Sequence, residues 1–422
     1  MKEDLLHFLW RFRRFDHSAL STTEGEPVEI LQPGTHNTHA GPDFSNARLK
    51  IGSTVWAGNV EMHLHSSGWL QHKHQDDRAY DNVILHVVLE EDQPVLRADG
   101  SRLPCLEMKN RIPPKLIGSY QKLLHNEHWI PCQHQFYEVP EMTRSLWLDR
   151  LLVERLEQKT AAILHTLQAN KGNWEETFYQ ILARNFGLKI NAEPFEMLAQ
   201  SLPQNILAKH RDNLLQLEAF LFGQAGLLGQ DFGEAYPNRL QSEFGFLQKK
   251  YALTPLNSAA WKFLRLHPAN FPTIRLAQFA RLVQQSAHLF SKILEVKSQA
   301  DIESLFEVKL DGYWLTHYTF GNESPKKNKS LGKDAVRLLT INTIVPFLFV
   351  YGSQQGNQDF KDLAISLLER LPAERNAIIM GWQRLGMEAK SAYQTQALLQ
   401  LKNVYCDRKR CLECAVGGAI LK

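Results

Sequence analysis

The chain has 422 residues, of which 44% are apolar and 22% charged, as in a soluble globular protein of two or three domains. Its formal net charge of +3 excludes a strongly basic whole-chain field, so any contact with nucleic acid must come from a local patch. The amphipathic N-terminus is unlike a signal peptide, and residues 338–350, the most apolar later segment, are too few to span a bilayer. Because the five cysteines form no disulfide framework, we expect a cytoplasmic protein with no membrane partner.

The first third of the chain has mostly strand-like periodicity. A helix is predicted over residues 3–15, ahead of segments whose apolar residues alternate or run continuously. The predicted strands cover residues 27–31, 47–51, 55–65 and 82–90, followed by two short strands within 95–108 around an Asp-Gly turn. This order of elements predicts a central mixed sheet flanked by helices.

From about residue 140 onward, the apolar spacing changes to the 3.6-residue period of helices. Helices are predicted over residues 147–164, 174–185, 194–200, 205–226, 239–251, 275–295, 334–351, 359–371 and 391–401. We therefore predict an α+β protein with two parts. A mixed-sheet domain covers residues 1–135, and a large, mainly helical region covers 136–422 and ends in a cysteine-rich tail.

Acids and histidines are concentrated between residues 36 and 88. Because alternate residues of a strand share one face, Glu61, His63 and His65 are expected to project together. Asp43, which follows a proline, is the natural acid to join them. Carboxylates suit Mg²⁺ or Mn²⁺, and added imidazole favours Mn²⁺ or Zn²⁺, so Asp43, Glu61 and His65 are predicted metal ligands. The alternative is a polar sheet face whose acids and imidazoles pair with one another.

Five further histidines lie in this region. His36 and His39 lie in a loop next to Asp43 and are candidate ligands or phosphate contacts, or else loop residues bonded to the backbone. His72 and His74 precede two aspartates, and the favoured interpretation is a solvated helix start rather than a second ligand group. His86, inside an apolar strand, is interpreted as a hydrogen-bonded core histidine.

The order helix, strand, Pro-Asp, strand with Glu-x-His, helix, apolar strand resembles the PD-(D/E)XK (restriction-endonuclease-like) nuclease superfamily over about residues 1–115. The resemblance implies that Asp43 and Glu61 bind a divalent metal. His63 stands where the superfamily has lysine and would orient or deprotonate the attacking water, although imidazole carries no permanent charge near neutral pH. The whole chain is also similar to an uncharacterised bacterial protein family of unknown function, which implies no mechanism.

The function implied by the resemblance is divalent-metal-dependent hydrolysis of phosphodiester bonds in DNA or RNA, with Mg²⁺ or Mn²⁺ as cofactor. Glu3 or Asp4 would add an acid from the first helix. The lysine-rich segment that ends at Lys333 would contact the nucleic acid. Glu107-x-Lys109 is a rival Glu-x-Lys pair, placed second because it follows the apolar strand.

Two other classes of function remain open. One is a catalytically inactive nucleic-acid-binding or assembly protein on a nuclease-like scaffold. The other is a His/Asp metal hydrolase of a small substrate, which would enclose its site in a pocket.

A second motif lies near the C-terminus, where Cys406, Cys411 and Cys414 follow the spacing C-x4-C-x2-C. Such a loop directs several sulfurs inward and is typical of a zinc or iron–sulfur site. Zinc or a [4Fe–4S] cluster requires four ligands, and Cys132 or Cys105 is a candidate for the fourth. The alternative is a redox-sensitive tail, or buried thiols that act as small hydrophobes.

Overall fold

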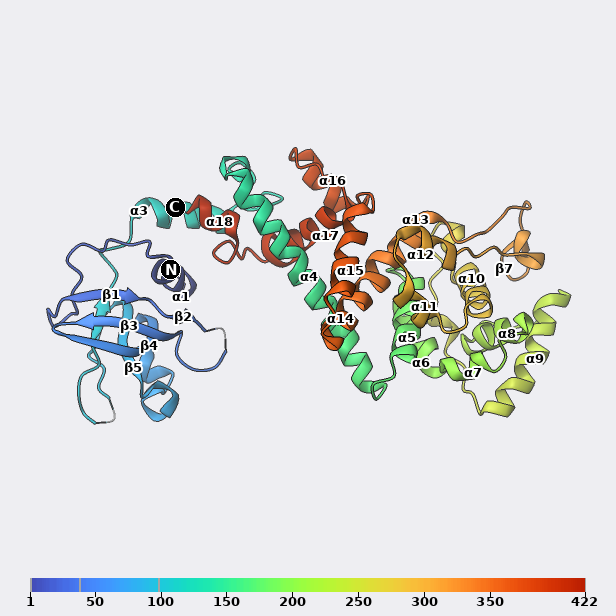
Figure 1. Ribbon diagram of the computed structural model, residues 1–422, viewed down its shortest axis with the longest axis horizontal. Coiled ribbons are helices and arrows are strands. Elements are labelled where there is room, and N and C mark those ends of the chain that lie inside the picture. Colours follow the sequence, from blue (N-terminus) through green and yellow to red (C-terminus); the bar gives the residue numbers. More distant parts are fainter. Residues whose placement is uncertain (1, 38, 98, 422) are drawn as a thin grey trace. The chain divides into compact units, whose positions relative to one another are not determined.

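In the computed structural model, which describes residues 2–37, 39–97 and 99–421, the strand-patterned segments form one six-stranded sheet (Figure 1). Its strands are β1 Val28–Gln32, β2 Thr35–His36, β3 Phe44–Ile51, β4 Thr54–His65, β5 Val83–Glu90 and β6 Cys105–Glu107. They lie in the order β1-β3-β4-β5-β6, with β2 paired to β3. β1, β3 and β4 are antiparallel, whereas β4, β5 and β6 are parallel. The predicted mixed sheet is confirmed.

Helix α1 (Glu3–Phe12) packs against β4 through one apolar face, because its buried residues recur at helical spacing. It ends three residues earlier than predicted, where Arg13 adopts a left-handed backbone with φ 50°. The crossover from β4 to β5 contains α2 (Gly68–Gln71) and two single turns, η1 (His74–Asp76) and η2 (Arg78–Tyr80). Instead of a predicted hairpin, residues 95–108 form one isolated Leu96–Arg102 bridge and the short β6.

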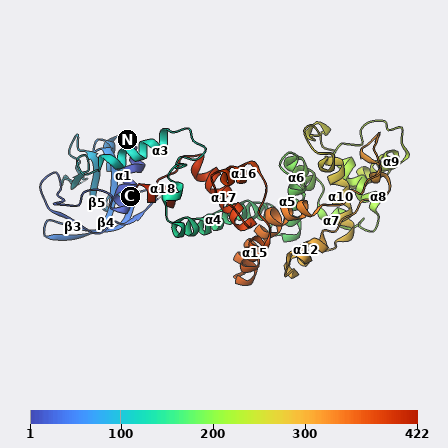
Figure 2. The ribbon, with the colours of Figure 1, turned by 90° about the horizontal axis from the view of Figure 1, so that it is seen from above.

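The chain divides into two compact units. Unit 1 comprises Met1–Leu148 and Leu401–Lys422, and unit 2 comprises Asp149–Gln400. Besides the sheet, unit 1 contains α3 (Pro114–His125), η3 (Phe136–Glu138), the start of α4 (Glu141–Ala169), the π-helical turn η8 (Leu401–Cys406) and α18 (Ala415–Ile420). α3 and α18 lie side by side in both views (Figures 1 and 2).

This division differs from the predicted boundary at residue 135, which grouped the cysteine-rich tail with the helical region. The tail belongs to unit 1 because its side chains contact residues there: the rings of Trp147 and Tyr405 lie 5.2 Å apart, and the Lys409 ammonium donates hydrogen bonds to the carbonyls of Leu124 and Asn126. These contacts connect residues far apart in the chain, so local periodicity contains no sign of them.

Unit 2 is predominantly helical, as predicted. Its elements after α4 are α5 Trp174–Phe186, α6 Ala192–Ser201, α7 Gln204–Ala208, α8 Leu214–Gln224, α9 Ala235–Tyr251, η4 Ser258–Ala260, η5 Pro268–Asn270, α10 Pro272–Gln285, α11 Leu289–Glu295, α12 Gln299–Leu305, η6 Gly312–Leu315, β7 His317–Thr319, β8 Asn322–Glu323, α13 Lys333–Leu339, η7 Thr340–Ile344, α14 Val345–Gln355, α15 Gln358–Arg370, α16 Ala377–Arg384 and α17 Ala392–Gln400.

Two predicted helices of unit 2 are each split. The predicted helix 205–226 divides because the Asn213 side chain accepts a hydrogen bond from the Gln216 N–H and starts α8 afresh. The predicted helix 275–295 divides at His288, whose left-handed backbone (φ 52°) ends the helical path before α11. The continuous helical segment Lys333–Gln355 is longer than the helix predicted over residues 334–351. By length and composition it is able to cross a membrane, but 67% of its apolar window is buried inside the structure.

Candidate metal site

Two acids from neighbouring strands lie side by side. Phe44 of β3 pairs with Val60 of β4, which places Asp43 next to Glu61. The Asp43 N–H donates a hydrogen bond to Glu61 Oε2 (3.0 Å), and the Met62 N–H donates one to Asp43 Oδ2 (3.0 Å). Burial of Glu61 and the negative charge of Asp43 raise the pKa of Glu61 to about 9. A divalent cation between the two carboxylates would remove the cost of placing both charges there.

The first helix contributes His7 to these acids. His7 Nε2 lies 3.2 Å from Asp43 Oδ2. Burial lowers the pKa of His7, but the hydrogen bond and charge of Asp43, with the charges of Asp4 and Glu3, outweigh it and raise the pKa above its ordinary value. Glu3 is half-buried and also raises the pKa of Glu61, whereas Asp4 is exposed. Of the two acids expected from this helix, both act on the charge of His7, and Glu3 also acts on Glu61.

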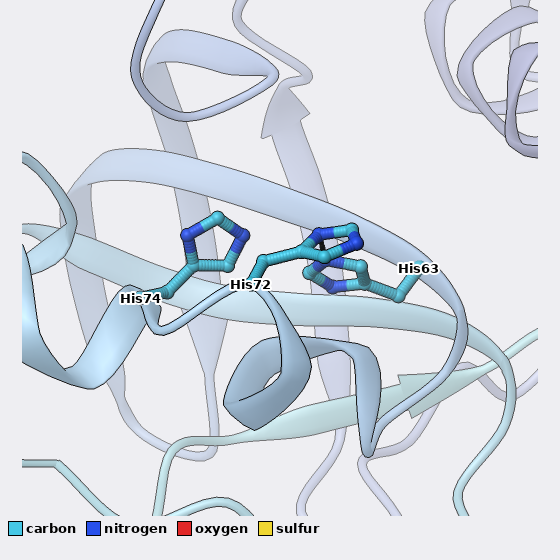
Figure 3. Close-up of side chains that lie close together, drawn as sticks. All are labelled: His63, His72 and His74. Atoms are coloured by element: carbon cyan, nitrogen blue, oxygen red, sulfur yellow. Dashed lines mark hydrogen bonds between the residues drawn. The ribbon is translucent and has the colours of Figure 1, made fainter.

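Three imidazoles gather on the other side of Glu61 (Figure 3). One ring nitrogen from each of His63, His72 and His74 lies within 4.8 Å of the others. His63 Nε2 is hydrogen-bonded to His72 Nδ1 at 3.1 Å. The Glu61 Oε1 atom lies 3.3 Å from His74 Nε2 and 3.8 Å from His63 Nε2. Glu61 therefore joins the acidic pair to the imidazole group.

His63 is only 2% exposed, and its ring is held on the opposite edge by His86 of β5. His63 Nδ1 and His86 Nε2 are 2.9 Å apart. Burial, followed by the nearby imidazoles, lowers the pKa of His63 to about 2, so His63 is neutral and does not replace the charge of a lysine. When His63 Nδ1–H donates to His86, the lone pair of His63 Nε2 is directed to the imidazole group, as in a metal-binding histidine.

The local backbone explains how His72 and His74 reach His63. His72 ends α2, His74 begins η1, and the Lys73 between them has a left-handed backbone with φ 61°. Gly68 begins α2 directly over the His63 ring, where an added Cβ would lie 2.6 Å from His63 Cδ2. His72 is exposed, so the imidazole group is open to solvent on that side.

Of the remaining predicted histidines, His36 lies next to His7, whereas His65 and His39 are outside the group of three imidazoles. The half-buried His36 ring lies 5.3 Å from that of His7, and its pKa is lowered by burial and by His7 and Arg11. His65 is exposed at the end of β4, outside the group of three, because the strand carries it beyond the covered part of the sheet. His39 is exposed, and its N–H donates to the Asn37 side chain.

The predicted lysine contacts have other partners. Lys333 begins α13 in unit 2, is exposed, and lies 3.8 Å from Glu303 Oε2. Lys329 of the same segment is buried, and its ammonium donates hydrogen bonds to the carbonyls of Trp314 and His317. The segment is therefore not wholly a loop of free lysines. In the rival motif, the Lys109 ammonium lies 2.7 Å from Glu90 rather than next to Glu107.

Sequence reasoning did not include His7 and assigned His72, His74 and His86 to other roles. His86 is the expected buried, hydrogen-bonded histidine, but its partner is the site residue His63. His74 does begin the short helix η1, and His72 just before it is exposed, but both rings also lie close to that of His63. The available signal was the spacing of His-x-His after a strand that already carries Glu-x-His.

The predicted C-terminal cysteines also meet. Cys406, Cys411 and Cys414 each interact electrostatically with the others and with Cys132. Cys105 lies apart on β6, where its electrostatic neighbours are Glu91, Arg102 and Glu107. Of the two candidates for a fourth cysteine, Cys132 is therefore the one that joins the group.

Fold and site together define an α+β protein with a carboxylate–imidazole group in its mixed-sheet unit. Residues 3–377 match a protein family described as "Protein of unknown function (DUF2851)", and the chain belongs to this family. The matched region contains the acids, the imidazole group and Cys132. Comparisons with curated proteins and with solved structures find no match.

Proposed function

We propose that unit 1 is a divalent-metal-dependent hydrolase of phosphodiester bonds in DNA or RNA. The observation that carries the proposal is the pairing of Asp43 with Glu61 through reciprocal backbone hydrogen bonds, with His63 next to Glu61. The order of α1, the antiparallel strands, α2 and the parallel β5 supports it, because the nuclease superfamily resembled by the sequence uses this order. The restriction-endonuclease-like fold is part of this proposal.

In the proposed reaction, Asp43 and Glu61 hold Mg²⁺ or Mn²⁺. The metal ion would polarise the phosphate and lower the pKa of a bound water. Because His63 is buried and neutral, its part is to bind or orient at Nε2 rather than to supply positive charge. His7, beside Asp43, offers a positive charge close to the same acids.

The test is a cleavage assay on single- and double-stranded DNA and RNA in Mg²⁺ and in Mn²⁺, with wild type and Glu61→Gln. Glu29→Gln is the matched control, because Glu29 is an exposed glutamate on β1 of the same sheet. We expect wild type and Glu29→Gln to cleave, and Glu61→Gln to lose activity by more than about 100-fold, since a metal ligand matters at least as much as an outer partner.

Two outcomes contradict the proposal. Cleavage that survives Glu61→Gln would show that the acids are not the site. A folded wild type that binds nucleic acid but cleaves none in either metal would favour the catalytically inactive binding protein.

A second candidate is a zinc-dependent hydrolase of a small substrate. The observation that favours it is the imidazole group, since three histidines with a position left for water form a common catalytic zinc site. The two candidates depend on different residues. Loss of activity in His72→Ala with small phosphate or carboxylate esters and Zn²⁺, while Asp43→Asn remains active, would favour the small-substrate enzyme.

A further inference from the structure

The four grouped cysteines come from two segments that are far apart in the chain and share one anchor. Cys132 follows α3, whereas Cys406 ends η8 and the other two cysteines lie between η8 and the start of α18. The Asn126 side-chain amide donates a hydrogen bond to the Pro131 carbonyl (2.8 Å), next to Cys132. The Lys409 ammonium, from the loop between Cys406 and Cys411, donates one to the Asn126 carbonyl (3.0 Å). Asn126 therefore holds both cysteine-bearing segments together.

The four thiols are largely buried. Each of the four interacts electrostatically with the other three. Burial and the neighbouring thiols raise the pKa of Cys132 and of Cys411 to about 12 and also raise that of Cys406. Three cysteines within nine residues, joined by Cys132 from a segment that hydrogen bonds tie to the same loop, supply the four thiolate ligands that a metal centre requires.

Donors are already directed at one of these sulfurs. Burial raises the pKa of Cys414, and hydrogen bonding from the backbone N–H groups of Gly417 and Val416 acts in the opposite direction. Hydrogen bonds of this kind to cysteine sulfur are a feature of iron–sulfur sites, where they stabilise the thiolate ligands.

The start of α18 lies directly on the cysteine loop. A Cβ at Gly417 would lie much closer to the carbonyl oxygen of Cys411 than van der Waals contact allows. At the next residue, Gly418, an added Cβ would meet only Phe8 of α1, at an ordinary 3.7 Å. The close approach at Gly417 keeps Cys411 and Cys414 in a fixed relation to each other.

The distances between the sulfurs distinguish a site for a single metal ion from a site for an iron–sulfur cluster. In the described part of the chain, the group of ligand atoms that lies within 4.8 Å of one another is the imidazole group, so the four sulfurs are spread more widely. A single tetrahedral zinc with Zn–S bonds of about 2.3 Å would need its sulfurs about 3.8 Å apart. A four-iron core lies between its thiolates and holds them farther from one another.

We propose that Cys132, Cys406, Cys411 and Cys414 bind a [4Fe–4S] cluster, which fastens the C-terminal segment to the rest of unit 1. The cluster goes beyond the proposed hydrolase and does not depend on it. The residues of the acid and imidazole site are a different set from the cysteines.

The experiment uses the full chain, produced with added iron and purified without oxygen. Iron, zinc and acid-labile sulfide are counted per chain in wild type, Cys132→Ser and Cys411→Ser. Cys105→Ser is the matched control, because Cys105 is buried in the same unit but lies outside the group. We expect about four iron and about four sulfide per chain in wild type and in Cys105→Ser, and loss of most of both in the other two variants.

A second measurement covers variants that fail to fold. Chelator-stripped wild type is compared with the loaded protein by limited proteolysis, and we expect faster cleavage within residues 401–422 after stripping. Wild type that contains zinc without sulfide, or that contains no metal after iron supply, would overturn the cluster. Full iron content in Cys132→Ser would overturn the proposed ligand set. An unchanged rate of cleavage within residues 401–422 after the metal is removed would overturn the fastening role.

Discussion

His63 Nδ1 and His86 Nε2 lie 2.9 Å apart, on the adjacent parallel strands β4 and β5, with their rings nearly perpendicular. His86 is fully buried, and its other ring nitrogen has no hydrogen-bond partner among the residues described. A buried polar atom without a partner costs stability. In the proposed metal site, a hydrogen bond from His63 Nδ1–H to His86 would leave His63 Nε2 as the nitrogen that binds the ion.

Replacing His86 with leucine should separate metal binding from stability. We expect the affinity for Mn²⁺ or Zn²⁺ to fall about 10- to 100-fold, because His63 loses the partner that orients it. The metal-free protein should unfold at about the same temperature, because removal of the partnerless His86 Nδ1 is offset by the loss of the hydrogen-bond partner of His63 Nδ1. Calorimetric metal titration and thermal unfolding measure the two effects. Unchanged affinity in a folded variant would contradict the orienting role.

Gly68→Ala should weaken the same site by displacing a ring. The added Cβ would lie 2.6 Å from His63 Cδ2, so the imidazole must shift away from His72 and His74. We expect a loss of metal affinity of about tenfold. Gly118→Ala is the control, because a Cβ at that position in α3 has nothing within 4 Å. Equal affinity in the two variants would show that the His63 ring position is unimportant.

Gly417 and Gly418 of α18 allow a matched test of how closely the helix packs on the cysteine loop. Gly417→Ala should lower the iron content and destabilise unit 1 by about 1–3 kcal/mol, the usual cost of overpacking. Gly418→Ala should keep the iron and gain about 0.5–1 kcal/mol, because alanine favours a helix. Iron analysis and denaturant unfolding give both quantities. A variant at Gly417 with full iron would argue against close packing on Cys411.

Unit 2 should show a pH dependence that arises from Glu218. This buried glutamate accepts hydrogen bonds from Tyr236 and Trp314, and burial raises its pKa from 4.5 to about 7. Because the folded pKa is the higher one, the folded state binds more protons between pH 4.5 and 7. Its contribution to stability is therefore present below pH 4.5 and is lost as the pH rises through 7.

The measurement is denaturant unfolding of wild type and Glu218→Gln at a series of pH values. We expect wild type to lose on the order of 3 kcal/mol relative to the variant between pH 4.5 and 8. Glu193→Gln, at an exposed position in α6, should keep the slope of wild type. Parallel curves for wild type and Glu218→Gln would show that Glu218 ionises normally.

The sheet and the acidic pair were within reach of the sequence. Alternation over residues 55–65 predicts both β4 and the shared face of Glu61 and His63, and the apolar run 82–90 predicts the buried β5. The contact between Asp43 and Glu61 follows once β3 and β4 pair as neighbours. These features depend on local spacing and on strands adjacent in the chain, which periodicity describes well.

The rest depends on contacts that spacing does not encode. His7 lies on a helix whose pattern reports only which face is buried, not which strand it meets. His72 and His74 join the site through the left-handed turn at Lys73, a conformation that lysine adopts without a sequence signal. The return of residues 401–422 to unit 1 rests on side-chain contacts with residues almost three hundred positions earlier.

The return of the chain to unit 1 has a consequence for biosynthesis. Because synthesis proceeds from the N-terminal side of the chain, the sheet and Cys132 leave the ribosome well before Cys406, Cys411 and Cys414. Residues 149–400, which form unit 2, must be made in between. Folding of unit 2 during this interval shortens the flexible loop that closes when Tyr405 reaches Trp147 and so reduces the entropy cost of closure. Synthesis of unit 1 therefore begins before that of unit 2 and is completed after it.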